Sequence, residues 1–324
     1  MITAAFLWFL VQGIDFDALS HTFAKLSITL LVLALACLAA GYTVRIIRWW
    51  WMLRTFEPSL PIRACVWPFL TSIAVNNVMP FRAGDALRVF GFRLQLCSPA
   101  VRILGTLVIE RILDLVTLLG FFFLGLIGLP SGAFPVRFVV GATWLAGFSI
   151  AVVLLLILLA PWLGRMLQPI ATHWFFANRN LSAAIATHGG HFVDALSLVR
   201  SPLRLLLLLG LSVLTWTFEG AMFATVAGAV HAHVRLFGPW FSLGTGTLAT
   251  LIPSLPGYVG TFDYFAAQGL EAYGATPAVS VVFALTVHAV LWVPLTTAGL
   301  TYLTLLSNGF WTARPDPASA LDKE

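Results

Sequence analysis

The sequence predicts an all-α polytopic membrane protein, and three observations lead to that fold class. Hydrophobic residues make up 60% of the 324 positions and charged residues only 10%, whereas an ordinary soluble domain carries about 25% charged residues. The apolar residues gather in long runs of the length that a helix needs to cross a bilayer. These runs lack the alternation of apolar and polar residues that is typical of a membrane β-barrel.

Six apolar runs predict the spanning helices, at about 20 mostly apolar residues for each crossing. Five of them are clear, namely residues 25–44, 103–127, 136–160, 203–230 and 277–306. The first run, residues 1–13, is barely long enough, and it lacks the basic n-region and the cleavage site of a removed signal peptide. We interpret it as a short first membrane segment, and whether it crosses stays open.

Two further apolar stretches, residues 61–98 and 238–274, are interrupted by prolines and glycines. Neither predicts one uninterrupted helix, because Pro breaks the helical hydrogen-bond ladder and Gly weakens it. Broken backbone at membrane depth is tolerated only where protein or a water-filled cavity covers it. We therefore expect two re-entrant helical hairpins.

The basic residues predict the orientation, because cytoplasmic loops carry an excess of Lys and Arg. If the N-terminus is cytoplasmic and each hairpin returns to its own side, Lys25, Arg137 and Arg235 remain on the outer side. The cytoplasmic side then holds Arg45, Arg48, Arg54, Arg63, Arg93, Arg102, Arg165, Arg179, Arg200, Arg204, Arg314 and Lys323. We expect an inner (plasma) membrane protein with both termini cytoplasmic.

Two segments predict contact with the cytoplasmic interface. Residues 45–54, RIIRWWWMLR, combine arginines with the Trp anchors that are typical of headgroup level. Residues 161–201 mix charged, His and aromatic residues, as a helix lying in the interface does.

The chain reads as a single transmembrane domain, 1–324, in which a segment–hairpin–segment pattern occurs twice. The first copy covers about 25–127 and the second about 203–306, with a linking helix and the interfacial segment at about 135–201. Three crossings separate equivalent points, so the second copy enters from the opposite face. We expect inverted repeats of the kind that recurs in transporters, with their broken helices meeting near the midplane.

Ionisable residues inside apolar segments are the candidate functional residues, because they cost several kcal/mol unless paired or hydrated. The first cluster is Arg82, Asp85 and Arg88 in the first hairpin. The spacing of three places these side chains on one face if Gly84 begins a helix, whose N–H groups favour an anion. The surplus positive charge predicts an anion site; the alternative is a structural ion pair that closes the hairpin.

The second cluster, Glu110, Arg111 and Asp114, lies on the 103–127 run with the spacing of one helix side. Because it is net negative, it can neutralise part of the first cluster or bind a proton. The alternative is that it only orients Arg82 or Arg88.

Five isolated polar residues form a third group of candidates. Asn76 and Asn77 precede the first hairpin tip, Glu219 and His288 lie in spanning runs, and Asp263 follows the second tip. A lone membrane His is more often hydrogen-bonded packing than a proton relay. For Asp263 the alternative is a charge on the outer surface.

Catalytic motifs are absent from the sequence. It contains no GxSxG, HExxH or GxxxxGK[ST] pattern, and nothing in it resembles a nucleotide site. Cys37, Cys65 and Cys97 have no metal or redox spacing and fit packing. We expect no enzyme activity, no metal, no cofactor and no nucleic-acid partner.

Three motifs in order resemble one family. They are NNVMPFRAGDALR at 76–88, ERILDL at 110–115 and PSLPGYVGTFD at 253–263. They are similar to the bacterial and archaeal proteins that share the lysylphosphatidylglycerol synthase transmembrane region, often called flippase-like, and the likeness spans about 25–306. The matching positions are Asn77, Pro80, Arg82, Gly84, Arg88, Glu110, Arg111, Asp114, Pro256, Gly257 and Gly260. Asp85 and Asp263 stand where the family pattern has Glu, and Tyr258 where it has a second Gly.

The resemblance implies a role in moving lipids, or lipid-linked headgroups, between leaflets. The expected headgroup-binding residues are Asn77, Arg82, Asp85, Arg88, Glu110, Arg111, Asp114, Gly257 and Asp263, and the proton-coupling candidates are Asp85, Glu110, Asp114, Glu219 and His288. Because only eighteen residues follow position 306, we expect no aminoacyl transferase domain.

Two other functions stay open at this point. One is a membrane-embedded enzyme, or an accessory subunit with a lipid-modifying enzyme as partner, acting on a lipid-linked glycan or a hopanoid. The other is a scaffold that only binds lipid. The expected partners are in each case membrane lipids, with an anionic headgroup in the transporter.

Overall fold

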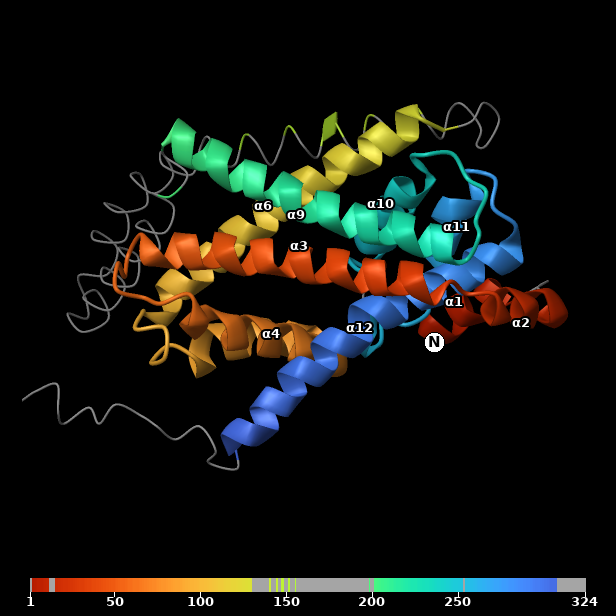
Figure 1. Cartoon of the computed structure of the whole chain (residues 1–324). Helices are drawn as coiled ribbons and strands as arrows, with labels where there is room; N and C mark the ends of the chain where they lie inside the picture. The colour runs from red at the N-terminus through yellow and green to blue at the C-terminus, as the bar shows by residue number, and fades with distance from the viewer. Residues whose placement is uncertain are drawn as a thin grey trace, which may run out of the picture.

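The computed structural model describes residues 2–11, 15–129, 201–252 and 254–307, with isolated positions between 140 and 198. Every regular element in this part of the chain is helical, as expected (Figure 1). The predicted span 136–160 and the interfacial segment 161–201 lie outside the described residues, apart from those isolated positions.

Three described helices are long and apolar enough to cross a membrane: α3 (Ile28–Arg54), α9 (Pro202–Ala229) and α12 (Pro277–Ser307). Two of them match the expected spans 203–230 and 277–306 to within one residue, and α3 overlaps the expected span 25–44 but continues to Arg54. A fourth helix, α6 (Ala100–Ile127), has 28 residues and is therefore about 42 Å long, which is enough to cross. It differs from the other three because it carries the second charge cluster. The helices α3 and α9 pack side by side, and a Cβ on Gly41 would lie only 3.3 Å from Phe218 of α9 (Figure 1).

The N-terminal run forms one short helix, α1 (Ile2–Val11), and a second short helix, α2 (Phe16–Ala24), follows it. With 10 residues, α1 is about 15 Å long, which is half the hydrocarbon thickness of a bilayer. It packs against the second hairpin, where the ring centroid of Phe6 lies 5.4 Å from that of Tyr264 and 5.5 Å from that of Phe265.

The first interrupted stretch doubles back on itself. Helix α4 (Arg63–Val78) is followed by the 3₁₀ turn η1 (Pro80–Arg82), the short helix α5 (Ala83–Ala86) and the π-helical turn η2 (Leu87–Gly91). The reversal occurs at Phe81 and Arg82, whose φ angles are 59° and 55°. Helix α5 then packs so closely on α4 that a Cβ on Gly84 would lie 1.9 Å from the Ser72 carbonyl oxygen.

The second interrupted stretch also folds as two helices joined by a turn. Helices α10 (Gly238–Ala249) and α11 (Thr261–Glu271) pack together, and between them lies the 3₁₀ turn η4 (Pro256–Tyr258). Gly257 has a φ of 74°, which an L side chain rarely adopts. The absence of one uninterrupted helix in either stretch is thus confirmed, whereas their depth in a bilayer and the inverted repeat stay predictions.

The tips of the two hairpins meet on α12. A Cβ on Gly257 would lie 2.9 Å from Trp292 Nε1 and 3.2 Å from the Asn77 carbonyl oxygen. The Asn77 side chain donates to Thr296 Oγ1 at 2.8 Å. His288, Trp292 and Thr296 recur every four residues, so one face of α12 holds both tips in place.

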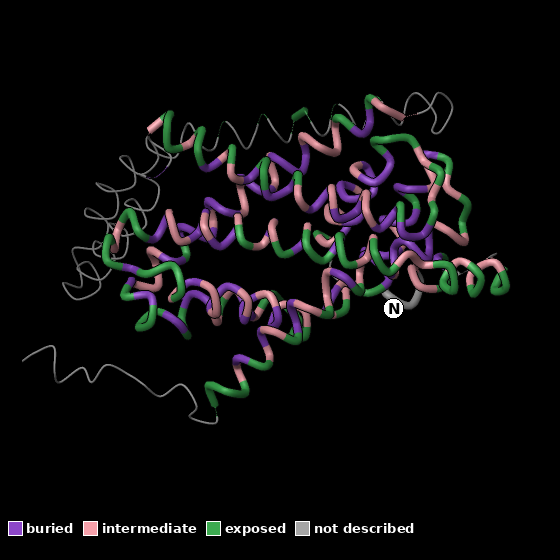
Figure 2. The backbone as a smooth tube through the Cα atoms, viewed as in Figure 1, coloured by how far each residue is buried: buried purple, intermediate pink, exposed green. Residues whose placement is uncertain are grey.

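The interfacial interpretation of residues 45–54 is wrong for its first half. Helix α3 continues without a break to Arg54, and Arg45, Arg48 and Trp49 are 8%, 0% and 0% exposed. These side chains face α6 and α9, which carry carboxylates at matching depth. The buried positions follow the inner faces of the helices, while Arg54 at the end of α3 is exposed (Figure 2).

Candidate functional site

The first charge cluster does not act as one unit. Arg88 is fully buried, and its Nη2 donates to Glu110 Oε2 at 2.9 Å. Its guanidinium also lies 3.7 Å from the ring centroid of Trp49 and 4.5 Å from that of Phe69. Arg88 and Glu110 therefore lock the first hairpin against α6 and α3, away from the cavity described below.

Arg82 has the opposite environment. Its side chain is 50% exposed, and its Nε lies 3.5 Å from Asp85 Oδ2. Asp85 Oδ1 accepts from Asn76 Nδ2 at 3.0 Å and from Arg111 Nη2 at 3.3 Å. Asp85 thus positions one arginine from the hairpin and one from α6.

Two further ion pairs tie α3 to its neighbours. Arg48 donates through both Nη atoms to the Asp114 carboxylate, at 2.6 and 3.1 Å. Arg45 pairs with Glu219 on α9 and lies over the ring of Trp216, 4.8 Å from its centroid. Trp216 Nε1 also donates to Asp114, at 3.3 Å, so one network joins α3, α6 and α9.

The charges in this region do not cancel. The described residues that pair here include five arginines, 45, 48, 82, 88 and 111, and four carboxylates, 85, 110, 114 and 219. One positive charge is left over. Arg82 is the most exposed of the five, and each of the other four has an ion pair shorter than its 3.5 Å pair with Asp85, so the surplus charge is available at Arg82.

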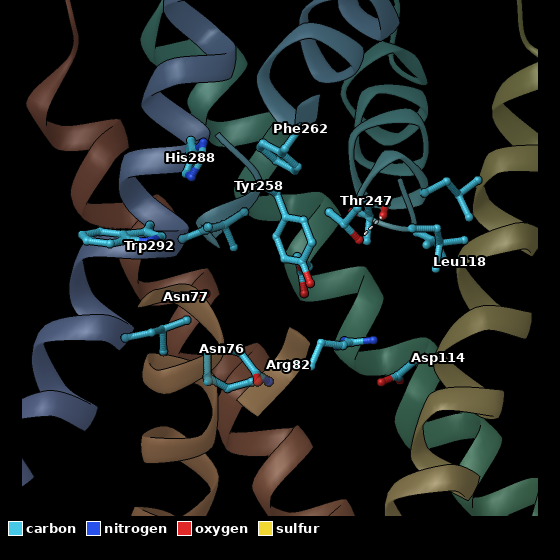
Figure 3. Close-up of a pocket in the computed structure, with 18 of the residues that line it drawn as sticks. Asn76, Asn77, Arg82, Asp114, Leu118, Thr247, Tyr258, Phe262, His288 and Trp292 are labelled. Atoms are coloured by element: carbon cyan, nitrogen blue, oxygen red, sulfur yellow. Dashed lines mark hydrogen bonds between the residues drawn. The ribbon is translucent and has the colours of Figure 1, made fainter. Parts of the chain in front are cut away.

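Arg82 borders a cavity of about 260 Å³ between the two hairpin tips and α3, α6, α9 and α12. Figure 3 shows Asn76, Arg82 and Asp114 at one level, with Tyr258, Phe262, Trp292 and His288 farther along the cavity. The cavity wall also includes Tyr42, Arg45, Asn77, Arg111, Trp216, Glu219, Thr247, Leu248 and Gly257. One end is polar and net positive, and the other is aromatic.

Two of the isolated candidates, Asp263 on α11 and His288 on α12, form a pair. Asp263 is 1% exposed, so it is no surface charge. Its Oδ1 lies 2.7 Å from His288 Nδ1, and its Oδ2 accepts from the Gly260 backbone N–H at 2.8 Å. His288 lines the cavity, whereas Asp263 lies behind it and orients it.

The structure therefore divides the expected site residues into two sets. Asn77, Arg82, Arg111, Asp114, Glu219, Gly257 and His288 border the cavity. Asp85, Arg88, Glu110 and Asp263 do not, and they hold the bordering residues or the hairpins in position. Within the part of the chain that the structure describes, no three His, Cys, Asp or Glu side chains gather as a metal site.

The profile of the lysylphosphatidylglycerol synthase transmembrane region matches residues 1–299. The chain belongs to this family. The resemblance of the three motifs is thereby confirmed, and the match covers both hairpins and most of α12. Together with the apolar helices, it makes the chain a membrane protein of a lipid-related family. No curated protein matches the chain.

In this member of the lysylphosphatidylglycerol synthase transmembrane-region family, the three motifs do not include all the residues that border the cavity. Tyr42 and Arg45 on α3 and Trp216 on α9 border the cavity but lie outside all three motifs. A signal for the α3 residues existed. Tyr42 near the end of the apolar run 25–44, Arg45 and Trp49 are spaced as i, i+3 and i+7, which places them on one helical face.

Proposed function

We propose that this protein moves an anionic phospholipid or a lipid-linked phosphate between leaflets, as a flippase, a scramblase or a lipid-carrier recycler. One observation carries the proposal: a cavity inside an apolar helical bundle, here called the polar cavity after its polar end, with a surplus arginine on its wall at that end. An ionisable group at membrane depth is costly, so an unneutralised one is a functional candidate.

The polar end of the cavity suits a phosphate. Arg82 and Arg111 offer charged N–H donors, and Asn76 and Asn77 add amide groups beside them. Arginine binds phosphate with paired N–H groups, and hydrogen bonds to a charged group are stronger than neutral ones. Asp85 keeps both arginines in place through its carboxylate, which leaves Arg82 partly free for the ligand.

A second, apolar cavity favours a lipid over a water-soluble anion. It has a volume of about 360 Å³, it lies between α6, α10 and α11, and it shares Leu248 with the polar cavity. On α6, Asp114 and Leu118 border the first cavity, and Phe122 and Leu126 border the second. The spacing of four places all of them on one stripe, along which a headgroup and its chain would lie end to end.

The remaining roles follow from position. Glu219, Asp114 and His288 border the cavity, so they are the residues through which proton uptake would be coupled to headgroup binding. We propose further that the protein lies in the inner membrane with cytoplasmic termini, that its two hairpins are re-entrant, and that it carries out no covalent chemistry on the lipid.

The test is leaflet exchange in liposomes. Purified protein is reconstituted with labelled anionic phospholipids or polyprenyl phosphates, with and without a proton gradient. We expect exchange by the wild type and a loss of about tenfold or more in Arg82→Ala and Asp85→Ala, since a charged hydrogen bond contributes about 1.5–3 kcal/mol. Arg93→Ala is the matched control, because Arg93 is exposed and does not border the cavity.

The outcomes separate the candidate functions. Exchange that Arg82→Ala and Asp85→Ala retain at the wild-type rate would contradict the assigned site. No exchange by the wild type with any of these lipids would contradict transport. A lipid product of changed mass would instead support an embedded enzyme or its accessory subunit.

A further inference from the structure

Tyr258 is the residue at the second hairpin tip whose conformation is least expected. It follows Gly257 and has a φ of 59°, in the left-handed region that bulky side chains rarely adopt. Such a conformation costs free energy and persists only where the surrounding structure imposes it. Here the preceding Gly257 is fixed between Trp292 and Asn77, so the tip cannot relax without leaving the first hairpin.

This backbone conformation sends the Tyr258 ring into the cavity. Figure 3 shows the ring between the aromatic and the polar ends, with its hydroxyl pointing toward Arg82 on the other hairpin. Among the described residues no side-chain hydrogen bond involves this hydroxyl, and its oxygen is accessible from the cavity. A phenolic O–H can donate to an anion, so one that is open to the cavity and faces a cation suggests a shared anionic ligand.

We propose that Tyr258 is a specificity-determining residue of this site, selecting lipids with a small phosphate headgroup. Its O–H donates to a phosphate oxygen held by Arg82, and its ring closes the space that a bulkier substituent on the phosphate would need. The inference rests on the proposed function. It adds the substrate class: an unsubstituted or minimally substituted phosphate rather than a phosphate that carries a sugar or a polyol ring.

Two substitutions separate the two parts of this role. Tyr258→Phe removes only the hydroxyl and keeps the ring. Tyr258→Gly removes the ring and also fits the positive φ, so relief of the strained backbone offsets part of the packing that the ring loses. The matched control is Tyr302→Phe, because Tyr302 lies on α12 but borders neither cavity.

The measurement is the Kd of purified protein in detergent for two short-chain probes, dihexanoyl phosphatidic acid and dihexanoyl phosphatidylinositol. We expect the wild type to prefer the phosphatidic acid. Tyr258→Phe should weaken its binding about tenfold, the effect of one hydrogen bond to a charged group, and keep the preference. Tyr258→Gly should bind the phosphatidylinositol more tightly than the wild type does, so that the ratio of the two Kd values falls about tenfold.

The possible results are distinguishable. Wild-type affinity and wild-type preference in both Tyr258 variants would overturn the inference and leave the proposed function standing, provided that Arg82→Ala still loses binding. A wild type that binds neither probe would overturn both. An equal loss in Tyr302→Phe would show that the effect does not come from the cavity, which also contradicts the role of Tyr258.

Discussion

Arg82 and Arg88 lie six residues apart on the same hairpin, yet the charge of Arg88 is buried and paired whereas that of Arg82 is half-exposed. The Arg88 guanidinium is enclosed by Glu110, Trp49 and Phe69, and its charge is fully compensated. Arg82 keeps half of its surface open and has one long ion pair. A buried charge without its partner is strongly destabilising, whereas an exposed pair contributes little to stability.

This contrast predicts different consequences for the two alanine substitutions. Arg88→Ala removes the hydrogen-bonded partner of the buried Glu110 carboxylate and leaves it only the 3.9 Å pair with Arg111, so it should lower the free energy of unfolding by about 3–5 kcal/mol. Arg82→Ala should change it by less than about 1 kcal/mol while slowing exchange about tenfold or more. Thermal unfolding in detergent, run beside the exchange assay, measures both effects. Equal destabilisation by the two variants would show that Arg82 is structural as well.

At the scale of elements, the first hairpin depends on the close contact of α5 with α4. The Cβ of any residue larger than Gly at position 84 would meet backbone atoms, 1.9 Å from Ser72 O and 2.9 Å from Asn76 N. Backbone cannot move aside as the end of a flexible side chain can. The contact also places Asp85 beside Asn76, which is how Asp85 comes to hold Arg82 and Arg111.

Gly84→Ala should therefore disrupt the hairpin. We expect a loss of at least about 3 kcal/mol, at the upper end of overpacking effects, or failure to fold. Gly120→Ala is the opposite case, because no atom lies within 4 Å of the added Cβ in the middle of α6. It should stabilise the protein by about 0.5–1 kcal/mol through helix propensity. Melting temperatures of the two variants check the prediction, and similar melting temperatures would contradict it.

The helix α3 is the element that joins the two halves of the site. Arg45 and Arg48 bind carboxylates on α9 and α6, and Tyr42 borders the same cavity. Each of these ion pairs crosses between helices, so the pairs fix the relative position of α3, α6 and α9. That position in turn sets the width of the cavity.

At the scale of the whole molecule, the native cysteines report on orientation. Cys97 is exposed and lies between Arg93 and Arg102, on the side expected to be cytoplasmic, whereas Cys65 is buried. A membrane-impermeant maleimide should label the wild type in inside-out vesicles and not in right-side-out vesicles, and Cys97→Ser should lose this labelling. Labelling of Cys97 in right-side-out vesicles would reverse the proposed topology.

The sequence by itself determined the class of the protein, the positions of the long helices and the two interrupted stretches. These depend on local properties: apolar run length for α3, α9 and α12, and Pro and Gly for the two hairpins. It also singled out Arg82, Arg111 and Asp114, because a charge in an apolar segment is conspicuous without any knowledge of its neighbours.

Only the tertiary structure decided which charge meets which. Arg45 pairs with Glu219 across 174 residues of sequence, and Arg48 with Asp114 across 66, so no spacing rule could reveal either pair. The same holds for the burial of Arg45 and Arg48, which looked interfacial only because α9 and α6 were not yet beside them. Ion pairing and burial depend on how whole helices pack, and that packing places Tyr258 opposite Arg82 as well.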